Sequence, residues 1–329
     1  MTAGASPSRL RPVFVGGCER SGTTMLGAML GGHSLCVCVP ESHFIEHLLE
    51  RCDLDLDTVE PQAMLASIVA NERYRVLWKL PLDPQAVDPT KLGSTYAEVL
   101  SWLVQAYGRH LGKPAPRVWV DQTPSNFKRG LTLLRMFPDA RFIHIVRDGR
   151  GVAASVLPLD WGPNDIVGAA EFWMARCAVG LVAEPQLGPD RVLRVRYEDL
   201  LAQPETSLRR IGSFAGLDYE PTMAQGVGYT PTRYNERQHR LVGQPLDQSR
   251  AHNWNRSLTP RQIEIFESVA GDFLEMLGYQ PEYGIRARPV RPHEVIPMTI
   301  GALLRRLRNA LRRRRRIRAS LVEPPMARS

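Results

Sequence analysis

The segment Val13–Leu30 constrains the fold of this chain more than any other part of its 329 residues. It begins with the apolar run Val13–Val15, continues through a glycine-rich turn, and takes on helical periodicity from Thr24 onward. This order predicts a buried strand, a tight loop and a helix, which together form a cradle for phosphate groups. Backbone N–H groups at the start of such a helix bind oxyanions without a metal ion.

The loop departs from the nucleotide-triphosphatase pattern at one position. Gly17, Gly22 and Thr24 fit that pattern, whereas Thr23 stands where a lysine is expected. That lysine normally reaches the β- and γ-phosphates of the nucleotide. The loop is therefore expected to bind a nucleotide without a γ-phosphate. The alternative is that the glycine-rich turn serves chain packing alone.

A second candidate anion site lies roughly 125 residues further along. Residues 141–146 predict another buried strand, Arg147 stands at its end, and Ser155 lies about two helical turns beyond. Two anion sites at the carboxyl ends of two strands suit a nucleotide that is phosphorylated at both ends of its ribose. The alternative is that Arg147 and Asp148 form a surface ion pair or a helix cap.

Because the two candidate phosphate-binding segments occur in this order along the chain, the chain resembles the sulfotransferases that use 3′-phosphoadenosine 5′-phosphosulfate (PAPS). The likeness covers roughly residues 10–280 and is strongest to the tyrosylprotein and bacterial branch, whose loop begins with arginine. The resemblance places the 5′-phosphosulfate in the first loop and the 3′-phosphate at the second segment. The nucleotide-binding residues that it implies are Arg20, Ser21, Gly22, Thr23, Thr24, Arg147, Ser155 and Tyr197.

Sulfuryl transfer needs a base for the acceptor hydroxyl and stabilisation of the leaving phosphate. Glu41 is the candidate base, because it follows an apolar strand and the resemblance implies a glutamate in this region. A bound sulfate nearby would raise its pKa, which suits a general base. The alternatives are that Glu41 caps a helix or that His43 or His33 is the base.

Stabilisation of the leaving group is assigned to Arg20, which makes it the second candidate catalytic residue. Relatives often have a lysine where this chain has Gln122, and some have one where it has Asn253. A neutral amide is a weaker donor than an ammonium group. Lys128 or Lys79 could supply the missing charge.

The predicted fold class is α/β: a P-loop-like, mostly parallel sheet flanked by helices in a single domain. Strand patterns fall at residues 12–16, 36–39, 117–120, 141–146 and 191–196. Helical patterns fall at 24–31, 41–51, 62–71, 94–111, 126–136, 149–157, 165–184, 204–215 and 260–277. We expect a flexible lead at 1–11, the sulfotransferase domain at 12–285 and an arginine-rich extension at 286–329. The polar stretch 225–254 is expected to form a functional loop over the site.

Composition limits the location and the cofactors of the protein. The chain has no apolar run of eighteen residues and no apolar segment near its start, so we expect a cytoplasmic protein. Five cysteines without a Cys-x-x-Cys spacing indicate neither zinc nor a disulfide framework. The resemblance implies PAPS as the co-substrate, and no metal ion is expected.

The net charge of +8 comes from the C-terminal extension, which carries ten arginines and one glutamate from Leu304 onward. Apolar residues recur there at helical spacing from Ile300 to Leu311. Such a basic amphipathic helix suits an anionic membrane surface, so the protein is expected to be peripheral at the inner membrane. Nothing that would read bases accompanies the run, which disfavours nucleic acid. The alternative is a helix packed on the body of the protein.

The predicted function is transfer of a sulfuryl group from PAPS to a hydroxyl acceptor. A P-loop nucleotide kinase or triphosphatase is the enzymatic alternative, with Asp121 holding magnesium. The second alternative is a non-enzymatic protein that binds membrane or RNA through its tail. The sequence does not distinguish among small-molecule, lipid, carbohydrate and peptide hydroxyls as the acceptor. Its pocket is expected in residues 42–80, 158–170 and 225–252, with Trp78, Trp161, Trp173 and Tyr229 as candidate lining residues.

Overall fold

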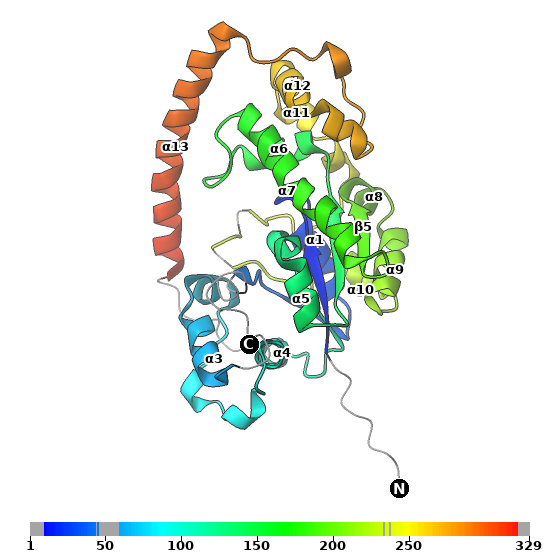
Figure 1. The fold of residues 1–329 in the computed structure, drawn as a ribbon, viewed down its shortest axis with the longest axis vertical. Coiled ribbons are helices and arrows are strands. Elements are labelled where there is room, and N and C mark those ends of the chain that lie inside the picture. Colours follow the sequence, from blue (N-terminus) through cyan, green and yellow to red (C-terminus); the bar gives the residue numbers. More distant parts are fainter. Residues whose placement is uncertain (1–9, 44, 46–58, 233, 237, 322–329) are drawn as a thin grey trace.

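A computed structural model of the chain describes residues 10–43, 45, 59–232, 234–236 and 238–321. Its centre is a five-stranded parallel sheet with the strand order β2-β3-β1-β4-β5 (Figure 1). The strands are β1 (Arg11–Gly16), β2 (Cys36–Val39), β3 (Val118–Asp121), β4 (Arg141–Val146) and β5 (Val192–Arg196). All five predicted strands are present within one residue of their expected bounds, and the predicted fold class is confirmed.

The first strand, β1, lies in the middle of the sheet, which explains its uninterrupted apolar sequence. Val13, Phe14 and Val15 are completely buried, because helices cover both faces of a parallel sheet. In the register, Phe14 pairs with Asp121 of β3 on one side and with Phe142 of β4 on the other. The carboxyl ends of β1, β3 and β4 therefore lie next to one another, where a ligand binds in folds of this type.

The faces of the sheet have different cores. Val13 and Val15 pack with Leu26 and Leu30 beneath the helix that follows β1. The opposite face is aromatic, and there Phe14 meets Trp119 edge-on with ring centroids 5.5 Å apart. The first face is covered by α1 (Thr23–Gly31), α8 (Tyr197–Ala202), α9 (Pro204–Ala215) and α10 (Pro221–Ala224). The second is covered by α3 (Pro61–Ala70), a π-helix (Tyr74–Trp78), α4 (Tyr96–His110) and α5 (Gly130–Met136).

A third apolar cluster holds the helices that follow β4. Trp173 packs against Phe266, with ring centroids 5.8 Å apart. The helices are α6 (Gly149–Val156), α7 (Ile166–Leu187), α11 (Trp254–Ser257) and α12 (Pro260–Met276). Among the described helices, α7 alone has the length and hydropathy of a membrane span. It is nevertheless a core helix here, because Trp173 and Cys177 on it are completely buried.

The last helix, α13 (Pro292–Leu321), stands along one side of the molecule, from the end near α12 to the end near α3 (Figure 1). It is longer than the apolar spacing of the sequence indicates. Short 3-10 turns complete the fold at Pro84–Ala86, Pro89–Lys91, Pro124–Arg129, Gln248–Ala251 and Gly284–Arg286.

Most predicted helices are present, with small differences in their bounds. The pattern predicted over 126–136 divides into a 3-10 turn and α5 at Gly130. The helix predicted over 41–51 lies largely outside the described residues. The short helices α8, α10 and α11 and the π-helix were not predicted, because each is only four to six residues long.

Candidate active site

The loop between β1 and α1 has the backbone of an anion cradle. Gly17 has φ +145° and Gly22 has φ +102°, conformations that side chains disfavour. A Cβ at Gly22 would also lie 2.7 Å from the Tyr197 ring. Gly22 is the N-cap of α1 and provides no capping side chain, so the first N–H groups of α1 keep their capacity for an anion. The Ser21 hydroxyl is buried there without a partner among the described residues.

Arg20 is held in place by two distant segments. Its Nε donates to Ser155 Oγ at 3.1 Å, and its Nη2 donates to the Gln238 carbonyl at 2.7 Å. Its backbone has φ +72°, a left-handed conformation that is rare for a residue with a side chain. Burial, together with the charge of Arg147, lowers the pKa of Arg20 to about 10. Arg20 therefore stays cationic at neutral pH and lies at the edge of the cradle.

Arg147, directly after β4, lies against the same loop. Its Nη1 donates to the Arg20 carbonyl at 2.9 Å, and its guanidinium lies 4.3 Å from the centroid of the Tyr197 ring. Nη2 donates to the Arg250 carbonyl at 3.4 Å, while Nε is buried without a partner among the described residues. The structure thus brings Arg20, Arg147, Ser155 and Tyr197 together, as the sequence interpretation required.

A buried ion-pair network follows Arg147 directly in the sequence, at the start of α6. Asp148 caps α6 by accepting from the Arg150 N–H at 2.8 Å, and its carboxylate also binds the Arg150 guanidinium at 2.7 Å. Arg150 reaches Glu267 of α12 at 2.7 Å and lies 4.0 Å from the Trp254 ring centroid. The alternative of an Arg147–Asp148 surface pair is therefore wrong, whereas the cap is present. The role of Arg150 was not predicted, because its partner Glu267 lies 117 residues away in the sequence.

Glu41 lies just beyond β2 and forms a close pair with His43. His43 Nε2 and Glu41 Oε2 are 2.7 Å apart. Burial raises the pKa of Glu41, but the hydrogen bond and charge of His43, together with the charges of His239 and Arg73, outweigh this and hold the pKa below its usual value. Burial lowers the pKa of His43, but its contact with Glu41 raises the pKa above the usual value. The protein's own groups thus oppose the rise in the pKa of Glu41 that an adjacent sulfate would cause.

The segment 225–254 brings residues to the site that the sequence did not single out. Gln238 holds Arg20, and His239 is close enough to Glu41 and Arg20 for electrostatic coupling. Burial lowers the pKa of His239 to about 4, so this imidazole is neutral at pH 7. The only signal in the sequence was the polar, histidine- and arginine-containing character of the stretch.

Several residues that were considered for the site have other contacts. Gln122 is completely buried against Gly27 of α1, and its amide has no partner among the described residues. His33 pairs with Glu220 at 3.4 Å. Asp121, the magnesium candidate, accepts from the Thr123 N–H at 2.9 Å and from the Asn126 amide at 3.2 Å. The described residues contain no cluster of three potential metal ligands.

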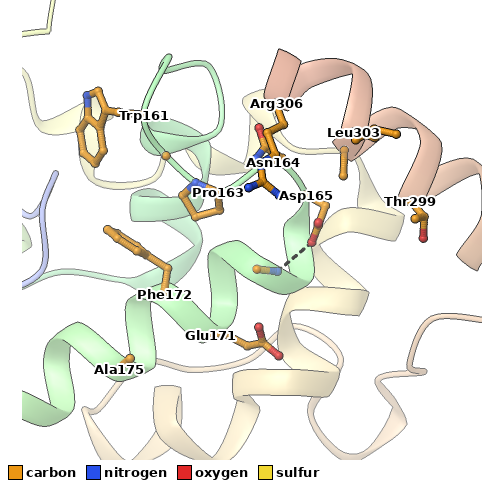
Figure 2. Close-up of a pocket in the computed structure, with 13 residues that line it drawn as sticks. Trp161, Pro163, Asn164, Asp165, Glu171, Phe172, Ala175, Thr299, Leu303 and Arg306 are labelled. Carbon is orange, nitrogen blue, oxygen red and sulfur yellow. Dashed lines mark hydrogen bonds between the residues drawn. The ribbon is translucent and has the colours of Figure 1, made fainter. Parts of the chain in front are cut away.

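The aromatic candidates for the acceptor pocket separate into two groups. Trp78, Trp173 and Tyr229 are buried in the three cores, so their assignment to the pocket is wrong. Trp161 instead lines an open cleft of about 740 Å³ between the 161–175 segment and α13 (Figure 2). Its Nε1 donates to the Gln238 side-chain oxygen at 3.1 Å, and Gln238 also binds Arg20. Gln238 therefore links Trp161 of the cleft to Arg20 of the cradle.

The fold and this site define an α/β protein with a phosphate-binding loop and two arginines converging on it. The sulfotransferase family matches residues 12–221, more than half of the chain. Protein-tyrosine sulfotransferase A of Caenorhabditis elegans is 23% identical over 284 residues, covering 82% of this chain and 67% of the worm protein. The protein-tyrosine sulfotransferase of Drosophila melanogaster is 25% identical over 281 residues, covering 82% of this chain but only 52% of the fly protein.

Solved structures agree with the family match. The sulfotransferase domain of the Synechococcus PCC 7002 olefin synthase superposes with a TM-score of 0.58 at 23% identity, covering 84% of this chain and 97% of that domain. The sulfotransferase domain from the curacin biosynthetic pathway gives a TM-score of 0.55 at 22% identity, covering 83% of this chain and 99% of that domain. The chain belongs to the sulfotransferase family, and its reaction is the transfer of a sulfuryl group.

Proposed function

We propose that the chain transfers the sulfuryl group of PAPS to a hydroxyl acceptor. The observation that carries this proposal is the convergence of Arg20 and Arg147 on one loop, linked by a 2.9 Å hydrogen bond. Two cations beside a helix N-terminus suit two separate phosphate groups, and the loop lacks the lysine that a γ-phosphate requires. The Tyr197 ring lies against Gly22 on one side and against the Arg147 guanidinium on the other.

In this proposal Glu41 accepts the proton of the acceptor hydroxyl. The acceptor oxygen then bonds to sulfur while the bond from sulfur to the 5′-phosphate oxygen breaks, leaving 3′,5′-diphosphoadenosine. Arg20 and the N–H groups of α1 stabilise the charge that develops on the leaving phosphate. His43 orients the Glu41 carboxylate through their 2.7 Å contact. No step requires a metal ion.

The acceptor is proposed to enter from the cleft beside Trp161. Trp161, Pro163 and Phe172 form one wall, and Leu303 of α13 contributes to the other (Figure 2). Polar side chains, among them Asp165 and Arg306, lie at the same opening. This lining favours a hydroxyl carried on an apolar or aromatic body, a description that fits a phenol, a lipid or a tyrosine side chain.

Two measurements test the proposal. Calorimetry should show metal-independent binding of 3′,5′-diphosphoadenosine and no comparable binding of ATP with magnesium. Mass spectrometry of a cell extract incubated with the protein and PAPS should show products that carry a sulfate. Preferential binding of ATP with magnesium would overturn the choice of donor.

A further inference from the structure

The helix α13 has two opposite faces with different contacts. Its inner face binds the body through polar groups: Asn309 Nδ2 donates to the Leu159 carbonyl at 3.2 Å. Arg316 binds both carboxylate oxygens of Asp160 at 3.0 and 3.1 Å and donates to the Tyr234 carbonyl at 3.1 Å. The helix is thus attached to the body mainly by hydrogen bonds and ion pairs, together with the partly buried Ile317, which packs against the aromatic core.

Five other large apolar residues of α13 point away from the body and form what we call the outer stripe. Its members are Ile296, Ile300, Leu304, Leu307 and Leu311, and each is between 54% and 67% exposed. At about 100° per residue, they occupy an arc of roughly 80° centred about 180° from Asn309 and Arg316. Five large apolar side chains in one exposed row are unusual for a monomeric surface and indicate a binding surface.

Arginines border the outer stripe along one edge and continue it beyond Leu311. Arg308, Arg312 and Arg315 follow this edge, Arg314 and Arg318 lie on the line of the stripe itself, and all five are exposed. The helix carries nine arginines and a single acidic residue, Glu294, which is already paired with Arg261 at 2.7 Å. An apolar row with a cationic edge and a cationic end matches an interfacial helix, whose apolar side chains enter the acyl boundary while its cations meet lipid phosphates.

We propose that α13 docks the protein on an anionic lipid bilayer through the outer stripe, with the helix lying parallel to the surface. A second copy of the chain fits this surface less well, because two such helices would bring their arginines together without acidic partners. Nucleic acid would neutralise the arginines but would leave the outer stripe in water. A bilayer of anionic lipid satisfies both features at once.

Sedimentation of the full chain with lipid vesicles tests the proposal. We expect binding to phosphatidylcholine vesicles that contain phosphatidylglycerol, and little binding to phosphatidylcholine alone. The triple substitution Leu304→Asp, Leu307→Asp and Leu311→Asp should lower vesicle affinity by about a hundredfold, because three apolar insertions are lost. Its matched control replaces two equally exposed apolar residues elsewhere, Leu131→Asp and Val182→Asp, and should leave binding unchanged.

A second variant tests the cationic edge formed by Arg308, Arg312 and Arg315. The substitutions Arg308→Gln, Arg312→Gln and Arg315→Gln remove three exposed charges and should also cost about a hundredfold on anionic vesicles. High salt should weaken the wild-type chain in the same direction. Circular dichroism melts and binding of 3′,5′-diphosphoadenosine should match the wild type for every variant, which separates this proposal from that of the donor site.

Three results would overturn the proposal. The first is wild-type vesicle affinity in the triple aspartate variant. The second is a lipid-free dimer that this variant dissociates, which would assign the outer stripe to a second copy. The third is tight binding of a short RNA by a chain that does not sediment with anionic vesicles.

Discussion

Replacing Arg147 with alanine should separate the two phosphate sites of the nucleotide. The guanidinium donates to the Arg20 carbonyl, stacks on Tyr197 and has a buried Nε without a partner among the described residues. We assign its remaining donors to the 3′-phosphate. Charge-assisted hydrogen bonds in a buried site are worth about 2–3 kcal/mol, which corresponds to a loss of about 30- to 150-fold in affinity for 3′,5′-diphosphoadenosine.

Adenosine 5′-phosphate is the internal control, because it has no 3′-phosphate. In that complex Arg147→Ala removes no phosphate contact, only the bonds to the Arg20 and Arg250 carbonyls and the contact with Tyr197 that hold the loop, so we expect a loss of about 1 kcal/mol or roughly fivefold in affinity. Calorimetric titrations of both nucleotides into the wild type, Arg147→Ala and Arg147→Lys measure the difference. The lysine variant should fall between the other two, since it keeps the charge and loses the planar fork. Equal losses for the two nucleotides would refute the assignment of Arg147 to the 3′-phosphate.

Three further predictions concern the base, its partner and the packing of the sheet. Glu41→Gln should keep nucleotide affinity and lower turnover by about 10²- to 10⁴-fold in a steady-state assay, because an amide cannot accept the hydroxyl proton; near-normal turnover would exclude Glu41 as the base. Because folding raises the pKa of His43, protonation of this side chain stabilises the folded state. This contribution is fully present at pH values below the ordinary pKa of 6.5 and is lost as the pH rises through the raised pKa. Urea unfolding should therefore show a larger destabilisation by His43→Gln at pH 6 than at pH 9, and a difference independent of pH would contradict the pairing. Gly180→Ala should destabilise the fold by about 1–3 kcal/mol, because a Cβ there would collide with the buried His144 ring, whereas Gly271→Ala in α12 meets nothing within 4 Å and should be neutral or stabilising.

The sheet was predictable because four of its five strands, all but β5, are buried on both faces. Glycine follows the apolar run Val13–Val15, and Arg147 follows the mostly apolar run 141–146. Each run therefore marks both a strand and the start of a site loop. The order of the strands in the sheet has no such local signal and was not predicted. The family and the two arginines of the cradle followed from the same two segments.

The rest of the site depends on contacts between distant parts of the chain. Gln238 reaches Arg20 across 218 residues, and no local pattern distinguishes it from other polar residues of its loop. The misassigned tryptophans show the opposite problem, since a large aromatic side chain suits a ligand pocket and a core equally well. Trp78 and Trp173 are almost completely buried, whereas Trp161 lies on a loop beside α13.

The two hydrogen bonds of Gln238 make Trp161 an indicator of events at the donor site. A nucleotide that draws Arg20 away from the Gln238 carbonyl would shift the loop that also holds the Trp161 indole. Trp78 and Trp119 are shielded from such a shift by their burial in the aromatic core, whereas Trp173 also contacts the site, since its Nε1 donates to the Arg147 carbonyl at 3.1 Å. We therefore expect changes in intrinsic fluorescence on addition of nucleotide to originate at Trp161 and Trp173. Trp161 would then act as an optical probe between the proposed donor site and the proposed acceptor cleft.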